Sequence, residues 1–190
     1  MSLEIILGPM FSGKSSRILT ILSRYAVLNR PVLVIKHAAD TRYAQNEVCT
    51  HDGRKAPCVN ASDFGRFPDE YLSRFQAIII EEAQFFAGLV DFVRHAVDDL
   101  NKNVYIVGLD GDSERRPFGE ILQCIPLADK VEKLTALCAR CANGREAIFT
   151  RRLRRMNQQM IVAGGDLYEA VCRECYWQFT GIDEVRRASL

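Results

Sequence analysis

Eight residues near the beginning of the chain have the types and the spacing of a phosphate-binding loop. The run Gly8-Pro9-Met10-Phe11-Ser12-Gly13-Lys14-Ser15 matches G-x-x-x-x-G-K-[ST] and directly follows the apolar residues Ile5 to Leu7. Glycines let the backbone curl so that successive N–H groups point at phosphate oxygens, and the N-terminus of a following helix attracts negative charge. The lysine of such a loop bridges the β- and γ-phosphates, and the serine hydroxyl joins the Mg²⁺ shell. A glycine turn with a coincidental lysine is the alternative, and the apolar run before and the helical pattern after favour the phosphate loop.

Two adjacent carboxylates, Glu81 and Glu82, follow a second apolar run at Ile78 to Ile80. A phosphate loop needs a carboxylate at the end of a neighbouring buried strand to hold the metal. Successive side chains on a strand point to opposite faces, so the two carboxylates need not have the same role. We expect one to hold Mg²⁺, with a water molecule between, and the other to accept a proton from an attacking hydroxyl. The alternative is a strand that ends in solvent with two charges.

Four of the seven cysteines form two pairs, Cys138-x-x-Cys141 and Cys172-x-x-Cys175. Zn²⁺ prefers four thiolates in a tetrahedron, and such a site stabilises a small unit that has little core of its own. Because four thiolates leave no open coordination position, the predicted zinc is structural and not catalytic. The segment between the pairs is longer than in a usual zinc ribbon, so we expect a long loop held at its base. Four reduced core cysteines are the alternative.

The elements that must position these residues follow from an alternation of apolar runs and segments with helical spacing. Strands are expected at Glu4 to Leu7, Val32 to Ile35, Ala77 to Ile80 and Val104 to Val107, with helices at Ser15 to Leu28 and Leu89 to Leu100. This order predicts an α/β fold of the P-loop (RecA-like) type, with a mostly parallel sheet and helices on both faces. The turn-rich residues Ala38 to Arg66 are expected to form a loop over the sheet edge.

The character of the chain changes near Thr135, where the cysteine pairs begin. We therefore expect a nucleotide-binding domain at residues 1–135, a small cysteine-clamped domain at 136–178 and a C-terminal tail at 179–190. A length of 190 residues suits one domain with such an appendage.

Composition excludes several classes of protein. The net charge of +1 gives no general attraction to nucleic acid or to acidic membranes. The longest apolar runs are far shorter than the roughly 20 residues of a membrane-spanning helix, and no secretory signal is recognisable. An odd number of cysteines without such a signal favours a reducing compartment. We expect a cytoplasmic protein that binds neither nucleic acid nor membrane.

The ordered set of motifs resembles the type II thymidine kinase family, which animals, many bacteria and poxviruses share. Besides the phosphate loop, the set comprises DTRY at 40–43, THD at 50–52, QFF at 84–86, LDG at 109–111, RRPFG at 115–119, KLTALC at 133–138 and VCRECY at 171–176. The phosphate loop alone occurs in a vast class, whereas the whole set with two cysteine pairs is specific. The resemblance covers nearly the whole chain. It implies transfer of the γ-phosphoryl group of ATP to the 5′-hydroxyl of thymidine, giving dTMP in nucleotide salvage.

The resemblance also implies roles for individual residues. Glu82 is expected to be the general base that takes the 5′-hydroxyl proton, and Glu81 stands where the family usually has an aspartate for the metal. Further contacts with ATP are implied for Asp40, Arg42 and Gln84. A "lasso" from Met160 to Tyr168 is expected to bind the base largely through its main chain. The implied nucleoside pocket has aromatic walls and a slot for the thymine methyl. Its residues are Met10, Phe85, Leu109, Phe118, Thr135, Met160, Ile161, Val162, Ala163, Gly164 and Tyr168.

Two departures from the family pattern lie in this pocket. Ser113 stands where close relatives often carry a phenylalanine against the base, and the chain is one residue shorter between Gly165 and Tyr168. We expect the reaction class to be unaffected, while deoxyuridine and even deoxycytidine stay open as acceptors. The family further suggests a homotetramer, with dTTP as a feedback inhibitor.

Two other classes of function stay open. Glu81-Glu82-Ala83-Gln84 is similar to the acidic motifs of helicase-type ATPases, and Arg151-Arg152-Leu153-Arg154-Arg155 is a candidate basic patch for nucleic acid. The near-neutral net charge argues against this ATPase, and we expect these arginines on an outer face at the base of a loop or in subunit contacts. A zinc-stabilised binding module with a merely structural nucleotide loop is the other alternative, which the intact Lys14 and Ser15 disfavour. Structural or surface roles are expected for His37, His51 and His95, and packing for Trp177.

Overall fold

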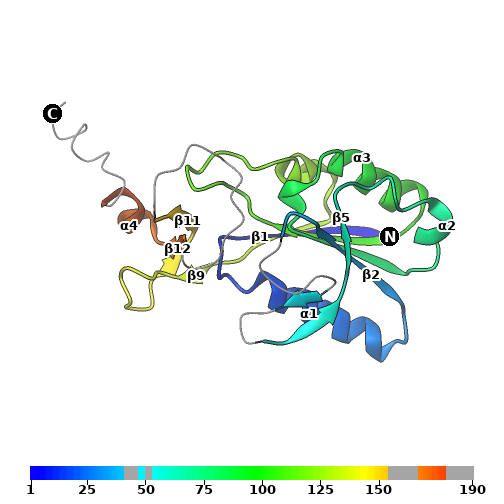
Figure 1. Cartoon of the computed structure of the whole chain (residues 1–190), viewed down its shortest axis with the longest axis horizontal. Helices are drawn as coiled ribbons and strands as arrows, with labels where there is room; N and C mark the ends of the chain where they lie inside the picture. The colour runs from blue at the N-terminus through cyan, green and yellow to red at the C-terminus, as the bar shows by residue number, and fades with distance from the viewer. Residues whose placement is uncertain (41–46, 50–52, 154–166, 179–190) are drawn as a thin grey trace.

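The computed structural model of the protein describes residues 1–40, 47–49, 53–153 and 167–178. Its body is built on a six-stranded sheet of order β5-β2-β6-β7-β1-β8, in which every neighbouring pair is parallel (Figure 1). The strands are β1 (Ser2–Leu7), β2 (Val32–His37), β5 (Val59–Ala61), β6 (Ala77–Glu81), β7 (Asn103–Gly108) and β8 (Lys130–Lys133). The apolar runs form its inner strands, because a parallel sheet covered on both faces needs strands that are apolar on both sides.

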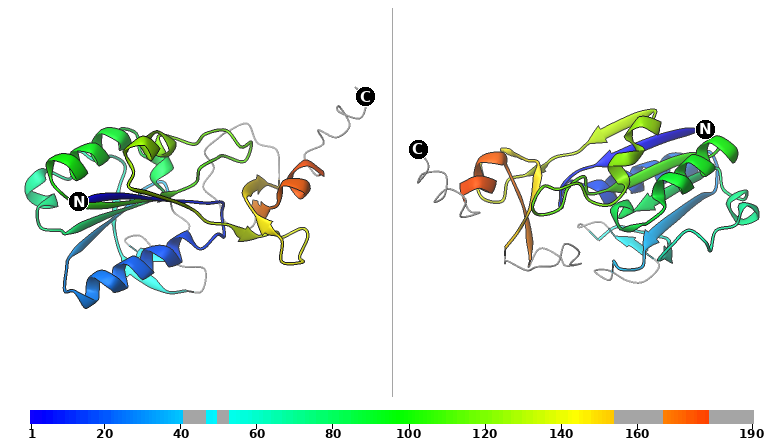
Figure 2. Two further views of the ribbon diagram at one scale, coloured as in Figure 1. Left: turned by 180° about the vertical axis from the view of Figure 1, so that it is seen from behind. Right: turned by 90° about the horizontal axis from the view of Figure 1, so that it is seen from above.

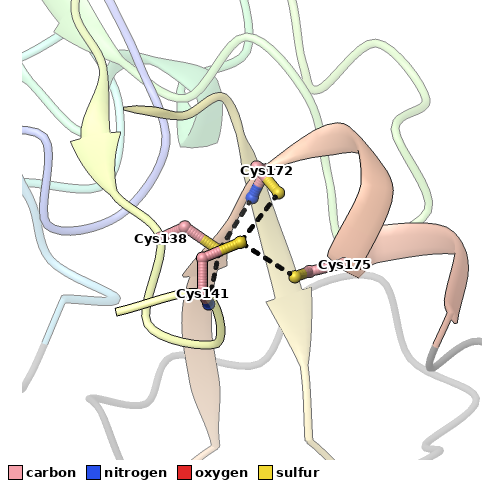
Figure 3. A group of neighbouring side chains, drawn as sticks. All are labelled: Cys138, Cys141, Cys172 and Cys175. Carbon is pink, nitrogen blue, oxygen red and sulfur yellow. Dashed lines mark hydrogen bonds between the residues drawn. The ribbon is translucent and has the colours of Figure 1, made fainter. Parts of the chain in front are cut away.

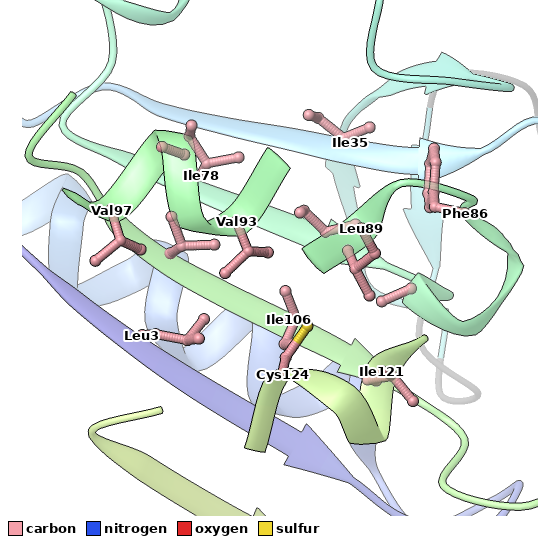
Figure 4. Packing of buried hydrophobic residues seen from close by; sticks show 14 of the residues in the cluster. Leu3, Ile35, Ile78, Phe86, Leu89, Val93, Val97, Ile106, Ile121 and Cys124 are labelled. Atoms are coloured by element: carbon pink, nitrogen blue, oxygen red, sulfur yellow. The ribbon is translucent and has the colours of Figure 1, made fainter. Parts of the chain in front are cut away.

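Helices cover both faces of this sheet, as the sequence predicts. Helix α1 (Lys14–Val27) packs Ile18 and Ile21 against Ile6 and Ile79 on one face. The other face carries α2 (Asp69–Leu72), α3 (Leu89–Arg94), the π-helical turn η2 (His95–Asp99) and the 3₁₀ segment η3 (Ile121–Leu127). Figure 4 shows the larger cluster of buried side chains there, which includes Leu3, Ile78, Phe86, Leu89, Val93, Ile106 and Ile121.

Two predictions about elements need correction, and one strand was missed. The helix expected to run unbroken to Leu100 continues after Arg94 as the π-helical η2. The expected loop from Ala38 to Arg66 contains strands: β3 (Glu47–Cys49) and β4 (Lys55–Pro57) pair with each other, and β5 forms one edge of the main sheet. The other edge strand, β8, was not expected. Edge strands this short, with the sequences VNA and KVEK, lack the apolar runs that identify the inner strands.

The cysteine-rich part of the chain forms a small unit beyond the carboxyl ends of the sheet strands (Figures 1 and 2). It consists of the antiparallel pairs β9 (Ala136–Leu137) with β10 (Glu146–Ala147) and β11 (Phe149–Arg152) with β12 (Tyr168–Val171), followed by α4 (Arg173–Gln178). The β11–β12 ladder joins Arg152 to Tyr168, and the Leu153 amide donates to the Leu167 carbonyl at 2.9 Å. These bonds fix the base of the segment 154–166, which lies outside the described residues, as does 179–190. The domain boundary at 135 stays a prediction.

No helix in the described part of the chain has the length and apolar character needed to cross a lipid bilayer.

Candidate active site

The phosphate loop leaves the end of β1 and enters α1 through unusual backbone conformations. Gly13 caps α1 with a φ of 83°, and Phe11 also has a positive φ, of 64°. A Cβ at Gly8 would lie 2.8 Å from the Leu134 carbonyl oxygen, so only glycine fits there. The Lys14 ammonium donates to the carbonyls of Gly8 at 3.0 Å and Pro9 at 2.7 Å. The loop therefore has the curled backbone and the inward lysine that phosphate binding requires.

The carboxylate of Glu81 faces this loop from the end of the neighbouring buried strand β6. The Ser15 hydroxyl donates to Glu81 Oε1 at 2.9 Å. Burial, and after it the nearby charge of Glu82, raises the pKa of Glu81 to about 7, although the Ser15 bond and the charge of Lys36 oppose the shift. A buried carboxylate with so high a pKa lacks sufficient positive charge around it. Ser15 and Glu81 thus form a pair of oxygen ligands suited to a divalent cation.

Buried charge continues onto the adjacent strand β2. Lys36 is the register partner of Glu81, and its ammonium lies 3.4 Å from the carboxylate of Asp40, with both side chains buried. Asp40, for which a phosphate contact was predicted, therefore lies near the carboxyl ends of the strands beside Glu81. Arg42, the next predicted phosphate contact, lies outside the described residues.

Glu82 stands where β6 ends, in the left-handed backbone region with φ 54° and ψ 42°. This conformation is unfavourable for a non-glycine residue, costing about 1–2 kcal/mol, and it is common at functional sites. The amide Nε2 of Gln84 donates to Glu82 Oε2 at 2.6 Å, while Gln84 Oε1 accepts from the backbone N–H of Leu109 at 3.0 Å. Gln84 is buried, and its predicted contact with ATP stays untested. Its side chain connects the second carboxylate to the residue that follows β7.

Two glycines leave the space that Gln84 needs in this position. A Cβ at Gly108 would lie 2.3 Å from Gln84 Oε1, and one at Gly119, where φ is 63°, would lie 2.0 Å from the Gln84 carbonyl oxygen. The segment from Leu109 to Gly119 therefore has both of its ends against Gln84.

The predicted nucleoside residues follow the carboxyl ends of adjacent strands. Met10, Leu109 and Thr135 come shortly after β1, β7 and β8, which are neighbours in the sheet, and Phe85 comes after β6. The rings of Phe85 and Phe118 meet edge to face with centroids 5.4 Å apart. Tyr168 is buried at the start of β12, with the Arg152 guanidinium 5.5 Å from its ring centroid. The remaining pocket residues, Met160 to Gly164, lie outside the described part of the chain.

The four paired cysteines come together in one cluster (Figure 3). Their sulfurs all lie within 4.8 Å of one another, and Cys141 Sγ is 3.7 Å from Cys172 Sγ and 3.4 Å from Cys175 Sγ. Ligands 2.3 Å from a tetrahedral Zn²⁺ would be about 3.8 Å apart, so the cluster fits that ion. Burial raises the pKa of Cys138, but backbone N–H groups, including those of Cys141 and Cys172, outweigh it and lower the pKa to about 6. The arrangement of the four sulfurs could therefore hold a metal ion.

The cysteine unit also contacts the phosphate loop directly. The Met10 N–H donates to the hydroxyl of Thr150, a buried residue of β11, at 2.9 Å. No sequence motif singles out Thr150, because the contact joins residues 140 positions apart. The cysteine unit is thus connected to the predicted phosphate loop.

One expectation about the arginine run was wrong. Arg151 does not lie on an outer face: it is buried, ion-paired with Glu169 and donates to the Cys175 carbonyl at 3.3 Å. The Glu169 carboxylate and the Cys175 carbonyl hold the Arg151 guanidinium inside the small unit. Arg154 and Arg155 lie outside the described residues.

Taken together, the parallel α/β sheet, the curled glycine loop and the strand-end carboxylates define a P-loop nucleotide-binding protein with a cysteine cluster. The family model "Thymidine kinase" matches residues 1–176. The chain is 41% identical over 179 residues to thymidine kinase a of Arabidopsis thaliana, covering 92% of this chain and 74% of that protein. It is 40% identical over 176 residues to the cytosolic thymidine kinase of Homo sapiens, covering 93% and 73%. For the thymidine kinase of vaccinia virus (strain Western Reserve), the identity is 37% over 174 residues, with 92% and 96% covered. The chain belongs to the thymidine kinase family.

Proposed function

We propose that this protein transfers the γ-phosphoryl group of ATP to the 5′-hydroxyl of thymidine, giving dTMP for nucleotide salvage. The observation that carries the proposal is the pair of carboxylates beside the phosphate loop. The Glu81 carboxylate accepts a hydrogen bond from the Ser15 hydroxyl. The next residue, Glu82, has a left-handed backbone conformation, and Gln84 donates a hydrogen bond to its carboxylate. This arrangement supports a phosphoryl-transfer site in which a metal-binding carboxylate and a proton-accepting carboxylate are neighbours.

Phosphate binding is assigned to the loop Gly8 to Ser15. Its backbone N–H groups and the N-terminus of α1 would surround the phosphates, with Lys14 exchanging the Gly8 and Pro9 carbonyls for phosphate oxygens. Ser15 and Glu81 would hold the Mg²⁺ that accompanies ATP, and such an ion would supply positive charge beside the phosphates. Asp40 and Arg42 are proposed to complete this end of the site.

Proton removal is assigned to Glu82. General-base catalysis contributes about 10²–10⁴-fold to a rate when the carboxylate is correctly placed. Gln84 is a positioning residue here, because its amide donates to Glu82 Oε2 and its carbonyl is fixed by the Leu109 N–H. These two hydrogen bonds hold the Glu82 carboxylate at a constant distance from Leu109, a residue of the proposed nucleoside pocket.

Thymidine is proposed to bind against Phe85 and Phe118, with Met10, Leu109 and Thr135 around the thymine methyl. Tyr168 and the main chain of Met160 to Gly164 would cover the nucleoside and exclude water. Ser113 leaves deoxyuridine, and even deoxycytidine, as further acceptors to be tested.

Several finer proposals rest on the family resemblance. The cysteine cluster is proposed to hold a structural Zn²⁺, since four thiolates fill its coordination shell. We also propose that the protein is a homotetramer and that dTTP is its feedback inhibitor. A cytoplasmic location is proposed as well, since the name of the human relative includes "cytosolic".

The test is steady-state phosphorylation by Mg-ATP of thymidine, deoxyuridine and deoxycytidine, with a reaction lacking nucleoside and one with added single-stranded DNA. Thymidine-dependent formation of dTMP is the expected result. ATP hydrolysis stimulated by DNA, without any phosphorylated nucleoside, would instead establish the alternative ATPase.

Glu82→Gln tests the proposed base within that assay. We expect kcat to fall by about 10²–10⁴-fold because the proton acceptor is lost. Equilibrium binding of thymidine should persist, since the amide has the same shape. Glu70→Gln, the same substitution at an exposed helix position, is the matched control. An unchanged kcat in Glu82→Gln would overturn the base assignment.

A further inference from the structure

The hairpin from Leu109 to Gly119 is the segment that connects the proposed nucleoside pocket to the cysteine unit. Its interior is well bonded: Gly111 and Pro117 form a β-bridge, and the Asp112 N–H donates to the Arg116 carbonyl at 2.9 Å. The buried carboxylate of Asp112 accepts the N–H groups of Glu114 and Arg116, each at 2.9 Å. The hairpin is therefore a rigid segment, and its orientation depends on the contacts made at its base and at its tip.

At its base, the hairpin is fixed by Gln84, which Leu109 and Gly119 contact directly. At its tip, it rests on the cysteine unit. The Tyr176 hydroxyl donates to the Ser113 carbonyl at 2.9 Å. Tyr176 lies next to Cys175, so this bond joins the tip to a residue adjacent to the cluster.

Arg115 makes the second and larger contact at the tip. Its guanidinium lies 4.2 Å from the ring centroid of Trp177, 4.5 Å from that of Tyr176 and 5.5 Å from that of Phe149. Its Nε is buried and has no hydrogen-bond partner among the described residues, so the aromatic side chains cover this edge of a half-buried guanidinium. Arg115 also has a positive φ of 64°, an unfavourable conformation that the surrounding contacts must maintain.

We propose that Arg115 is a positioning residue for the nucleoside acceptor: it locks the hairpin tip into the aromatic box of Phe149, Tyr176 and Trp177. The lock keeps Leu109 and Phe118, at the two ends of the hairpin, in place around the nucleoside. This inference rests on the proposed function for its readout. It assigns the cysteine unit a second role, as the support of the acceptor pocket, in addition to its contact with the phosphate loop through Thr150.

The chain offers a direct probe of this box, because Trp177 is its single tryptophan. Arg115→Met removes the charge but keeps an unbranched chain of similar length, and Arg115→Lys keeps the charge but loses the planar group that stacks on rings. Tyr176→Phe removes only the hydroxyl that bonds Ser113. Arg74→Met is the matched control, since Arg74 lies over Tyr71 at 5.8 Å on the exposed surface of the body.

For each variant, the experiment measures KM for thymidine, KM for ATP, bound zinc and tryptophan emission. In Arg115→Met, we expect KM for thymidine to rise about 10-fold, the effect of losing a desolvated cation–π contact. KM for ATP and zinc content should stay at wild-type values, with Trp177 emission shifted to the red. Arg115→Lys should be intermediate, Tyr176→Phe should raise KM for thymidine about 3- to 5-fold, and Arg74→Met should match wild type.

A wild-type KM for thymidine in both Arg115 variants overturns the proposal, whether or not Trp177 emission shifts. An equal rise in both KM values overturns it too, because that indicates general disruption and not acceptor positioning. If Arg115→Met loses zinc, Arg115→Lys and Tyr176→Phe decide the question. Wild-type protein that forms no dTMP would refute the proposed function instead, and the emission shift would still report the contact.

Discussion

The body of the molecule and its cysteine unit are stabilised in different ways. The body buries large aliphatic and aromatic side chains on both faces of its sheet, with Ile5, Ile78 and Ile106 fully covered. The buried cluster of the unit consists mainly of small residues: Ala136, Cys138, Ala147, Ala170, Val171, Cys172, Cys175 and Tyr176. Since apolar burial contributes about 25 cal/mol per Å², the unit gains little from its own core. A metal ion held by the four cysteines would supply the stabilisation that these side chains lack.

Removal of the metal should therefore give the largest difference in stability between the cysteine unit and the body. A chelator strong enough to strip zinc, or Cys138→Ser, is expected to melt the unit while the body keeps its circular dichroism and its thermal transition. Activity should fall by at least about 10²-fold, because the phosphate loop loses Thr150 and the hairpin loses its support. Zinc addition should restore the chelated protein, and Cys49→Ser, outside the cluster, is the control. Full activity in zinc-free protein would contradict the comparison.

A matched pair of core substitutions sharpens the comparison. Val104 in β7 and Val171 in β12 are both fully buried. Val104→Ala should destabilise the body by about 2 kcal/mol and lower its melting temperature by about 4–8 °C, through lost burial and a residual cavity. Val171→Ala should leave that transition in place and weaken zinc retention instead. Differential scanning calorimetry with parallel zinc analysis measures both, and equal shifts of the body transition would show that the regions melt as one.

Glu81 shows that the body also gives up stability at its functional edge. Its native pKa of about 7 exceeds the ordinary carboxyl value of 4.5, so the folded state binds more protons between these pH values. Stability must then fall as pH rises through this range, by about 1–3 kcal/mol. Glu81→Gln should therefore raise the melting temperature at pH 8, without nucleotide or metal, by a few degrees, and change little at pH 4. Thermal denaturation at both pH values tests this, and a lower melting temperature at pH 8 would contradict it.

The smallest effect is expected at the surface of the body. His95 joins α2 to η2 through Asp69 at 2.9 Å and Asp99 at 2.7 Å, and these hydrogen bonds raise its pKa above 6.5. Its contribution is fully present below pH 6.5 and is lost as pH rises through the raised native pKa. Because the pair is exposed and screened, His95→Gln should lower the melting temperature by only about 1–2 °C at pH 6 and not at pH 9. A larger loss would show that surface charge supports the body more than its core suggests.

The inner strands and the chemistry at their ends were predictable from the sequence because both have local signals. Apolar runs identify β1, β2, β6 and β7, and the spacing of glycines and cysteines identifies the phosphate loop and the cluster. Edge strands gave no such signal: β5 and β8 form because neighbours in the sheet offer free hydrogen-bonding groups, and their short polar sequences do not reveal this.

Contacts between distant residues were beyond prediction for a related reason. The packing of Gln84 against Gly108 and Gly119 depends on the positive φ of Gly119 and on the close approach of two segments. Arg115 meets Phe149 and Trp177 only after the hairpin and the cysteine unit have folded, so no spacing encodes the aromatic box. Arg151 was misplaced because a charge run was interpreted without knowing which of its members faces the inside of the unit.

The position of β1 inside the sheet has a consequence for biosynthesis. Ser2 pairs with Asn103, and Leu7 pairs with both Gly108 and Lys133, so β1 is made long before either of its neighbours in the sheet. At roughly 5–20 residues per second, a ribosome needs about 5–20 s to add the 101 residues that separate Ser2 from Asn103. During that interval, the nascent chain carries an apolar strand and a phosphate loop with no sheet to hold them. Competence to bind nucleotide is therefore acquired only after β7 and β8 have been made, long after the phosphate loop itself.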